Sequence, residues 1–130
     1  VEMVLYANDK AWGGEIFVPK IRSYNVVDLA KALAPACERV VVGIRPGEKI
    51  HEEMITVADS YTPYDLGKYY AILPQVPMFD RDEYLQAFDA KPVAAGFSYN
   101  SGSNEEWLSP EQLRELIRKY VDPNFSVTDA

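Results

Sequence analysis

The chain has 130 residues, enough for one domain or for part of a larger one. Thirteen basic residues against twenty acidic ones give a net charge of −7, the wrong sign for general affinity to a phosphate backbone, so nucleic acid is excluded as a partner. The single cysteine excludes an internal disulfide framework, and no apolar run approaches the roughly 18 residues of a membrane span. We therefore expect a soluble, cytoplasmic chain without membrane association.

The first residues predict a helix that is already under way. Val1 and the apolar residues after it have helical spacing without a capping residue before them, and Gly13-Gly14 breaks the pattern at about Trp12. A chain that opens in mid-helix is expected to be a piece of a longer protein. A processed or frayed terminus is the alternative.

The next segment has the pattern of a strand, a helix and a second strand. Residues 15–18 predict a short strand that Pro19 stops, and residues 26–34 predict a helix with one apolar face. The β-branched run 40–42 is typical of a buried strand, which we expect to lie parallel to the first. The expected fold is therefore α/β, a small, mainly parallel sheet with flanking helices.

A turn at residues 43–47 leads into a predicted short helix at 48–55, with Ile50 and Met54 facing inward. The rest of the chain is less regular. Residues 56–68 predict a loop, and residues 100–104 predict a turn. Between them the sequence predicts a strand at 69–73, a helix at 80–88 and a short strand at 97–99.

The last helix has the clearest local signals. Ser109 is a good N-cap, Pro110 fits the first helical position, and Gln112 completes a capping box. Apolar residues then follow at helical spacing until Pro123. We expect residues 122–130 to form a loose tail, and the whole of 1–130 to be one substrate-binding domain.

The densest chemical segment follows the predicted strand at 40–42. Arg45 lies where that strand ends, and ligands of α/β proteins commonly lie at such ends. A guanidinium there can hold a diphosphate with two parallel hydrogen bonds, and Glu48 can accept hydrogen bonds from two sugar hydroxyls. The alternative is an ordinary turn in which Arg45 pairs with Glu48 or Glu52.

The remaining chemical signals are weak. His51, the one histidine, cannot form a metal site alone, and we expect it to cap or pack on its short helix. No glycine-rich turn follows a strand, so the chain shows no dinucleotide site. No base, acid and cofactor come together, and we predict no catalytic, cofactor-binding or metal-binding residue in this chain.

Five segments carry a family resemblance: 15–21 (EIFVPKI), 28–32 (DLAKA), 43–54 (GIRPGEKIHEEM), 64–74 (YDLGKYYAILP) and 97–104 (FSYNSGSN). They resemble the distal part of the inverting UDP-N-acetylglucosamine 4,6-dehydratases, which are extended short-chain dehydrogenases/reductases. The Arg-Pro-Gly-Glu-Lys-x-His-Glu block is the most specific of them, and its proline and histidine favour the inverting group over a related dehydratase/epimerase branch. The family commonly has proline where this chain has Arg22, which affects the expected shape of the preceding loop.

This resemblance implies that Arg45 contacts a UDP diphosphate and Glu48 the uridine ribose, with Phe17 and Val18 beside the uracil, chiefly through backbone groups. The family's dinucleotide-binding half, with its NADP cofactor and catalytic residues, would precede Val1 and is expected to be the missing partner. Such enzymes are lyases that open the route to pseudaminic acid and related surface polysaccharides.

Two other functions remain open at this point. The chain could be a free-standing, non-catalytic module that binds nucleotide sugars or serves in assembly, or a structural domain with no affinity for UDP. An apolar face left exposed by an absent half would favour self-association into a homo-oligomer.

Overall fold

The computed structural model describes residues 1–59 and 63–127 and shows a mixed α/β chain in two compact units. The first unit combines Val1–Ile21 with Glu53–Asn100, and the second combines Arg22–Glu52 with Ser101–Ala130. Both units therefore join segments that are distant in the sequence. The assignment of residues 1–130 to one substrate-binding domain stays a prediction.

The first unit is built on a four-stranded sheet in the order β1-β4-β3-β5. Its strands are β1 (Ile16–Pro19), β3 (Pro63–Asp65), β4 (Tyr69–Ile72) and β5 (Lys91–Pro92), and every neighbouring pair is antiparallel. The strands predicted at 15–18 and 69–73 are confirmed, but the mainly parallel sheet is wrong. β1 takes its partner from β4 rather than from residues 40–42, and the short β3–β4 connection allows only antiparallel pairing.

Two helices belong to the same unit. α1 (Glu2–Lys10) and α3 (Arg81–Ala87) confirm the predictions at 1–12 and 80–88. Asp80 caps α3 by accepting a hydrogen bond from the N–H of Glu83 at 3.0 Å. The core consists of Ala71, Leu73 and Tyr84, surrounded by partly buried aromatic and leucine side chains.

A second, two-stranded sheet pairs β2 (Glu53–Ile55) with β6 (Tyr99–Asn100), also antiparallel, and Ile55 is fully buried. The loop predicted at 56–68 is only partly present, because it contains the 3-10 helix η1 (Val57–Asp59) and β3. The middle of that prediction, residues 60–62, lies outside the described residues.

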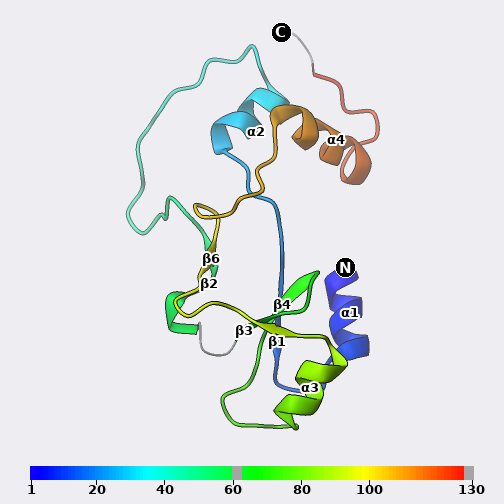
Figure 1. Ribbon diagram of the computed structural model, residues 1–130. Helices are drawn as coiled ribbons and strands as arrows, with labels where there is room; N and C mark the ends of the chain where they lie inside the picture. The colour runs from blue at the N-terminus through cyan, green and yellow to red at the C-terminus, as the bar shows by residue number, and fades with distance from the viewer. Residues whose placement is uncertain (60–62, 128–130) are drawn as a thin grey trace. The chain divides into compact units, whose positions relative to one another are not determined.

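The second unit is a helix pair. α2 (Val26–Leu33) and α4 (Pro110–Tyr120) lie side by side and confirm two predicted helices (Figure 1). The capping box of Ser109 and Gln112 is present as predicted. The core of the pair is made by Ala32, Leu108 and Leu113. Residues 128–130 of the predicted loose tail lie outside the described residues.

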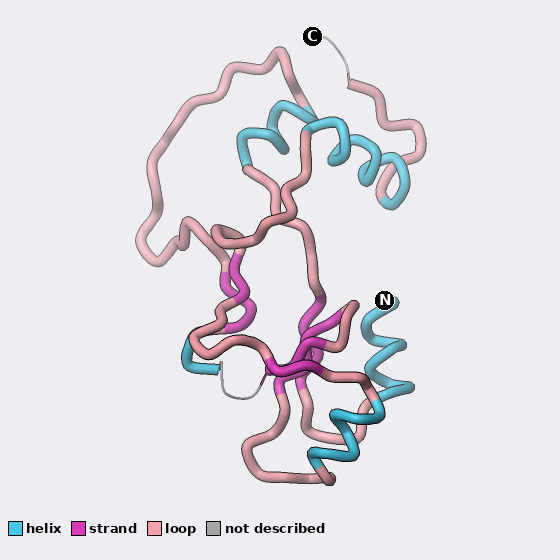
Figure 2. Tube along the Cα trace, in the orientation of Figure 1, coloured by secondary structure: helices cyan, strands magenta, loops and turns pink. Residues whose placement is uncertain are grey.

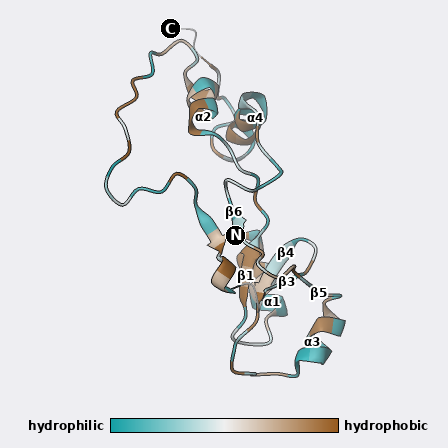
Figure 3. Cartoon of the chain, turned by 60° about the vertical axis from the view of Figure 1, so that its left-hand side comes forward, coloured by the Kyte–Doolittle hydropathy of each residue, from teal (hydrophilic) through white to brown (hydrophobic). Residues whose placement is uncertain are grey.

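A long connection, residues 34–52, joins α2 to β2 without a helix or strand (Figure 2). The strand predicted at 40–42 is wrong, since Val41 is 94% exposed and no strand pairs with it. The helix predicted at 48–55 is also wrong: Ile50 is 82% exposed and the segment ends in β2. Hydrophobic stretches therefore lie exposed along this connection (Figure 3). A β-branched run forms a strand only where a second strand supplies its hydrogen bonds.

Candidate functional site

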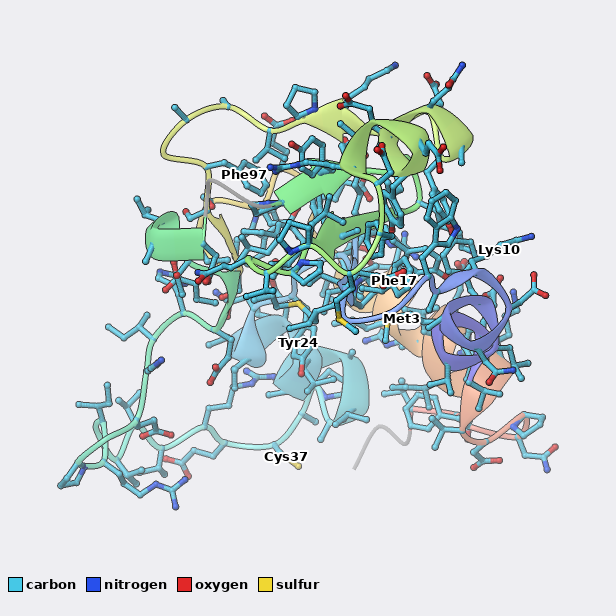
Figure 4. The ribbon with its side chains drawn as sticks, turned by 90° about the horizontal axis from the view of Figure 1, so that it is seen from below. Met3, Lys10, Phe17, Tyr24, Cys37 and Phe97 are labelled. Atoms are coloured by element: carbon cyan, nitrogen blue, oxygen red, sulfur yellow. The ribbon has the colours of Figure 1, made fainter. Side chains whose placement is uncertain are left out.

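β1 presents the two residues expected beside a uracil ring. Val18 is 5% exposed, and Phe17 packs edge-on against Tyr6 with ring centroids 5.5 Å apart. In Figure 4, Phe17 lies among the side chains of the first unit, whereas Lys10 projects away from it. Both side chains therefore serve packing, which leaves the backbone as the part that can contact a ligand.

The position of β1 at the edge of the sheet makes such backbone contacts available. Neighbouring residues of an antiparallel strand point their N–H and C=O groups to opposite sides. β1 has β4 on one side only, with Phe17 opposite Ala71 and Val18 opposite Tyr70. One of the two residues thus directs its backbone donor and acceptor away from the ladder.

A polar and aromatic cluster lies at the end of β1. The Nζ of Lys20 donates a hydrogen bond to Asp65 at 2.6 Å and lies 4.5 Å from the ring centroid of Tyr70. Burial, together with the negative charge of Asp65, raises the pKa of Tyr70 above its usual range. The phenol of Tyr70 therefore stays neutral, able to donate and to accept hydrogen bonds.

In the second unit, Arg45 and Glu48 form a closed turn. The backbone N–H of Glu48 donates to the carbonyl of Arg45 at 3.0 Å, and the N–H of Arg45 donates to Oε2 of Glu48 at 2.8 Å. Gly47 takes a φ of 81°, which favours glycine, and completes the turn. Glu48 thus closes the turn through backbone hydrogen bonds as well, whereas the sequence predicted only a pairing of the two side chains as the structural alternative.

The guanidinium of Arg45 is only loosely engaged by this turn. Its Nη2 lies 3.7 Å from Oε1 of Glu48, and its side chain is 86% exposed. An exposed ion pair at that distance contributes little to stability. The pairing expected as the structural alternative is present, with Glu48 rather than Glu52, yet it leaves most of the guanidinium donors available to an anion.

His51 does not lie on a helix, contrary to the prediction. It precedes β2 and faces the segment after β6, with Nδ1 3.4 Å from Oγ of Ser101. Sequence reasoning gave Ser101 and Gly102 only as part of a turn. No local signal could have linked them to His51, about fifty positions earlier.

The four expected site residues thus form two pairs. Arg45 and Glu48 are in contact in the second unit, and Phe17 and Val18 are adjacent in the first. Within residues 1–59 and 63–127, no three histidine, cysteine or acidic side chains gather as a metal site. The same residues contain no helix that could cross a membrane.

A family model described as polysaccharide biosynthesis protein matches residues 1–74. The chain belongs to this family. It is 44% identical over 121 residues to UDP-N-acetylglucosamine 4,6-dehydratase (inverting) of Campylobacter jejuni serotype O:2, and 42% identical to the protein of that name from serotype O:23/36. These alignments cover 90% of this chain and 36% of each relative. The predicted resemblance to the inverting dehydratases is confirmed.

More distant relatives agree with this placement. The chain is 36% identical over 124 residues to UDP-glucose 4-epimerase of Rickettsia felis, and covers 35% of that protein. Among solved structures, the X-ray structure of Pen from Bacillus thuringiensis matches 91% of this chain with a TM-score of 0.71 and 26% identity. The match spans 35% of the Pen chain. The chain therefore spans about a third of the length of the proteins it matches.

Proposed function

We propose that this chain is the C-terminal, UDP-sugar-binding part of an inverting UDP-N-acetylglucosamine 4,6-dehydratase. The observation that carries the proposal is the 44% identity to such a dehydratase over 90% of the chain. The exposed guanidinium of Arg45 agrees with it, because a diphosphate needs one or two placed cations rather than a basic surface. The lower identity to the epimerases favours the dehydratase, and a free-standing binding module is not favoured.

In this proposal Arg45 binds the diphosphate, Glu48 accepts hydrogen bonds from the uridine ribose, and the backbone at Phe17 and Val18 contacts the uracil. These contacts hold the part of the substrate that does not react. Their binding energy orients the sugar for chemistry carried out by other residues. The complete enzyme would be a cytoplasmic lyase of pseudaminic acid and surface polysaccharide biosynthesis.

The residues of this chain do not fit a dinucleotide cofactor. Gly13 and Gly14 follow a helix, Gly43 and Gly47 lie in the long connection, Gly67 lies between two strands, and Gly96 and Gly102 lie in the loops on either side of β6. None of them stands at the start of a helix that directly follows a strand, as a phosphate-binding turn requires. NADP is therefore assigned to a dinucleotide-binding half outside this chain. That half would supply the catalytic residues and the redox chemistry of the complete enzyme.

Isothermal titration of the chain with UDP tests this assignment. We expect saturable heat that Arg45→Ala largely abolishes. Arg39→Ala is the matched control, because Arg39 is exposed on the same connection and donates a hydrogen bond to the carbonyl of Pro35 at 3.0 Å. Equal loss in both variants would show that only general positive charge matters. The proposal would be contradicted if neither the folded chain nor the same chain extended upstream gave any heat of binding with UDP.

A further inference from the structure

We infer that His51 is a positioning residue for the Arg45–Glu48 turn: its ring, seated on Gly102, fixes the end of the connection to the segment Ser101–Asn104. The inference deepens the proposed function, because it names what holds the diphosphate-binding turn in place. His51 itself touches no part of a ligand in this account.

Hydrogen bonds join the two segments beside the ring. The N–H of Ser101 donates to the carbonyl of Glu52 at 2.8 Å, and the N–H of Glu52 donates to Oγ of Ser101 at 3.1 Å. The Nδ1 of His51 lies 3.4 Å from the same hydroxyl. The residue after His51 is thus bonded through both its donor and its acceptor.

Gly102 shows how close the ring approaches. A Cβ at this position would lie 2.8 Å from Cγ of His51 and 2.9 Å from Nδ1 and Cδ2, closer than real Cβ atoms come. Gly102 does not have a positive φ, unlike the six other glycines. A side chain at position 102 would therefore force the His51 ring to move, and the cause is the contact with the ring and not the backbone conformation.

The segment Ser101–Asn104, which contains Gly102, is hydrogen-bonded to the helix pair. Asn104 donates from Nδ2 to Oγ of Ser23 at 3.1 Å, and Ser23 is 8% exposed. The carbonyl of Ser23 accepts from the N–H of Leu108 at 2.8 Å, and Leu108 lies in the core of α2 and α4. His51 is thus connected, through Ser101–Asn104, to the helix pair of the second unit.

The segment before the Arg45–Glu48 turn makes few contacts that could hold the turn in place. Residues 40–44 make no hydrogen bond within the part of the chain that the structure describes, so the turn enters from an exposed segment. His51 is itself exposed, follows Glu48 by three residues and places its ring against Gly102. Losing that contact would let the turn sample more conformations, and a ligand would bind only the fraction with the correct arrangement.

A double-mutant cycle measures this role. In titrations with UDP, His51→Ala and Gly102→Ala should each weaken binding several-fold. The double variant should bind no worse than His51→Ala, because the added methyl group then meets no ring. His51→Phe retains a ring of similar shape and should restore most of the affinity. Ile50→Ala, beside His51 and 82% exposed, should bind as the parent does.

Amide hydrogen exchange in the ligand-free chain supplies a readout that is independent of UDP. The N–H groups of Arg45 and Glu48 should exchange several-fold faster in both single variants, and no faster in the double variant than in His51→Ala. Unchanged exchange, or additive effects in the cycle, would overturn the inference. If the folded parent binds no UDP, the proposed function fails, while exchange still decides the role of His51.

Discussion

The second unit contains two segments that are held in place in different ways. α2 and α4 bury Ala32, Leu108 and Leu113 between them, and Arg114 adds hydrogen bonds to the carbonyls of Ala32 and Lys31, both at 3.1 Å. The connection 34–52 buries no residue, and its best contacts are the Arg45–Glu48 turn and the His51 contact with Gly102. The helix pair is thus fixed by buried apolar surface, whereas the proposed binding turn depends on a few polar and steric contacts.

This difference predicts that a core substitution damages the helix pair far more than a substitution in the connection. Leu113 is 6% exposed, so Leu113→Ala should lower the free energy of unfolding by about 2–4 kcal/mol through lost burial and a cavity. Val41 is equally apolar but 94% exposed, and Val41→Ala should change that free energy by less than about 0.5 kcal/mol. Urea unfolding measures both, and similar losses would show that residues 40–42 are packed.

A smaller effect is expected at the start of α4. Oγ of Ser109 accepts a hydrogen bond from the N–H of Gln112, and the side chain of Gln112 accepts one from the N–H of Ser109. Ser109→Ala should therefore cost about 1 kcal/mol of unfolding free energy, while Ser109→Asp should retain most of it. Thermal unfolding of both variants measures this, and equal destabilisation would mean that the cap is not what stabilises the helix start.

In the connection 34–52, Glu48 should affect the local order of the turn at Arg45 but not the free energy of unfolding of the chain. Glu48→Ala removes the acceptor for the N–H of Arg45 and should speed exchange of that amide, with a change in unfolding free energy below about 0.5 kcal/mol. Glu48→Gln keeps an acceptor oxygen and should leave the exchange rate close to that of the parent. Equal rates in Glu48→Ala and the parent would contradict the closed turn.

The smallest effect is expected for an exposed ion pair of the first unit. Lys68 donates a hydrogen bond to Glu2 and lowers the pKa of that carboxyl. Because the folded pKa lies below the unfolded value, any stabilisation is present above the ordinary glutamate pKa and is lost as the pH falls through the lowered one. Lys68→Ala should raise the pKa of Glu2 toward its usual value in an NMR titration. Lys10→Ala, which removes a pair with Asp9, should leave it unchanged.

The parts of the fold that could be predicted carry their own local signals. α4 has its cap, its proline and its apolar stripe within a few residues, and the same reasoning located α2, α3 and β1. The failures concern non-local partners. The run at 40–42 has the residues of a strand but no strand beside it, and β3 and β5 are too short for a periodic signal.

The candidate site also combines a local contact that the sequence predicts with a long-range contact that it does not. Arg45 and Glu48 are three residues apart, so their contact could be anticipated, although not the backbone bond that closes the turn. The His51–Gly102 contact joins segments that are distant in the sequence, and a lone glycine in a polar turn gives no sign of the ring it meets. Its importance becomes visible only when a Cβ is placed on that backbone.

Backbone NMR of the chain, titrated in parallel with UDP, uridine and pyrophosphate, tests the central claim most directly. We predict that uridine shifts the amides of Phe17, Val18 and Glu48, that pyrophosphate shifts Arg45 and its neighbours, and that UDP shifts both sets with one common affinity. UDP that shifts neither set, or that shifts residues elsewhere while the chain remains folded, would contradict the assignment of this chain as the UDP-sugar-binding part of a dehydratase.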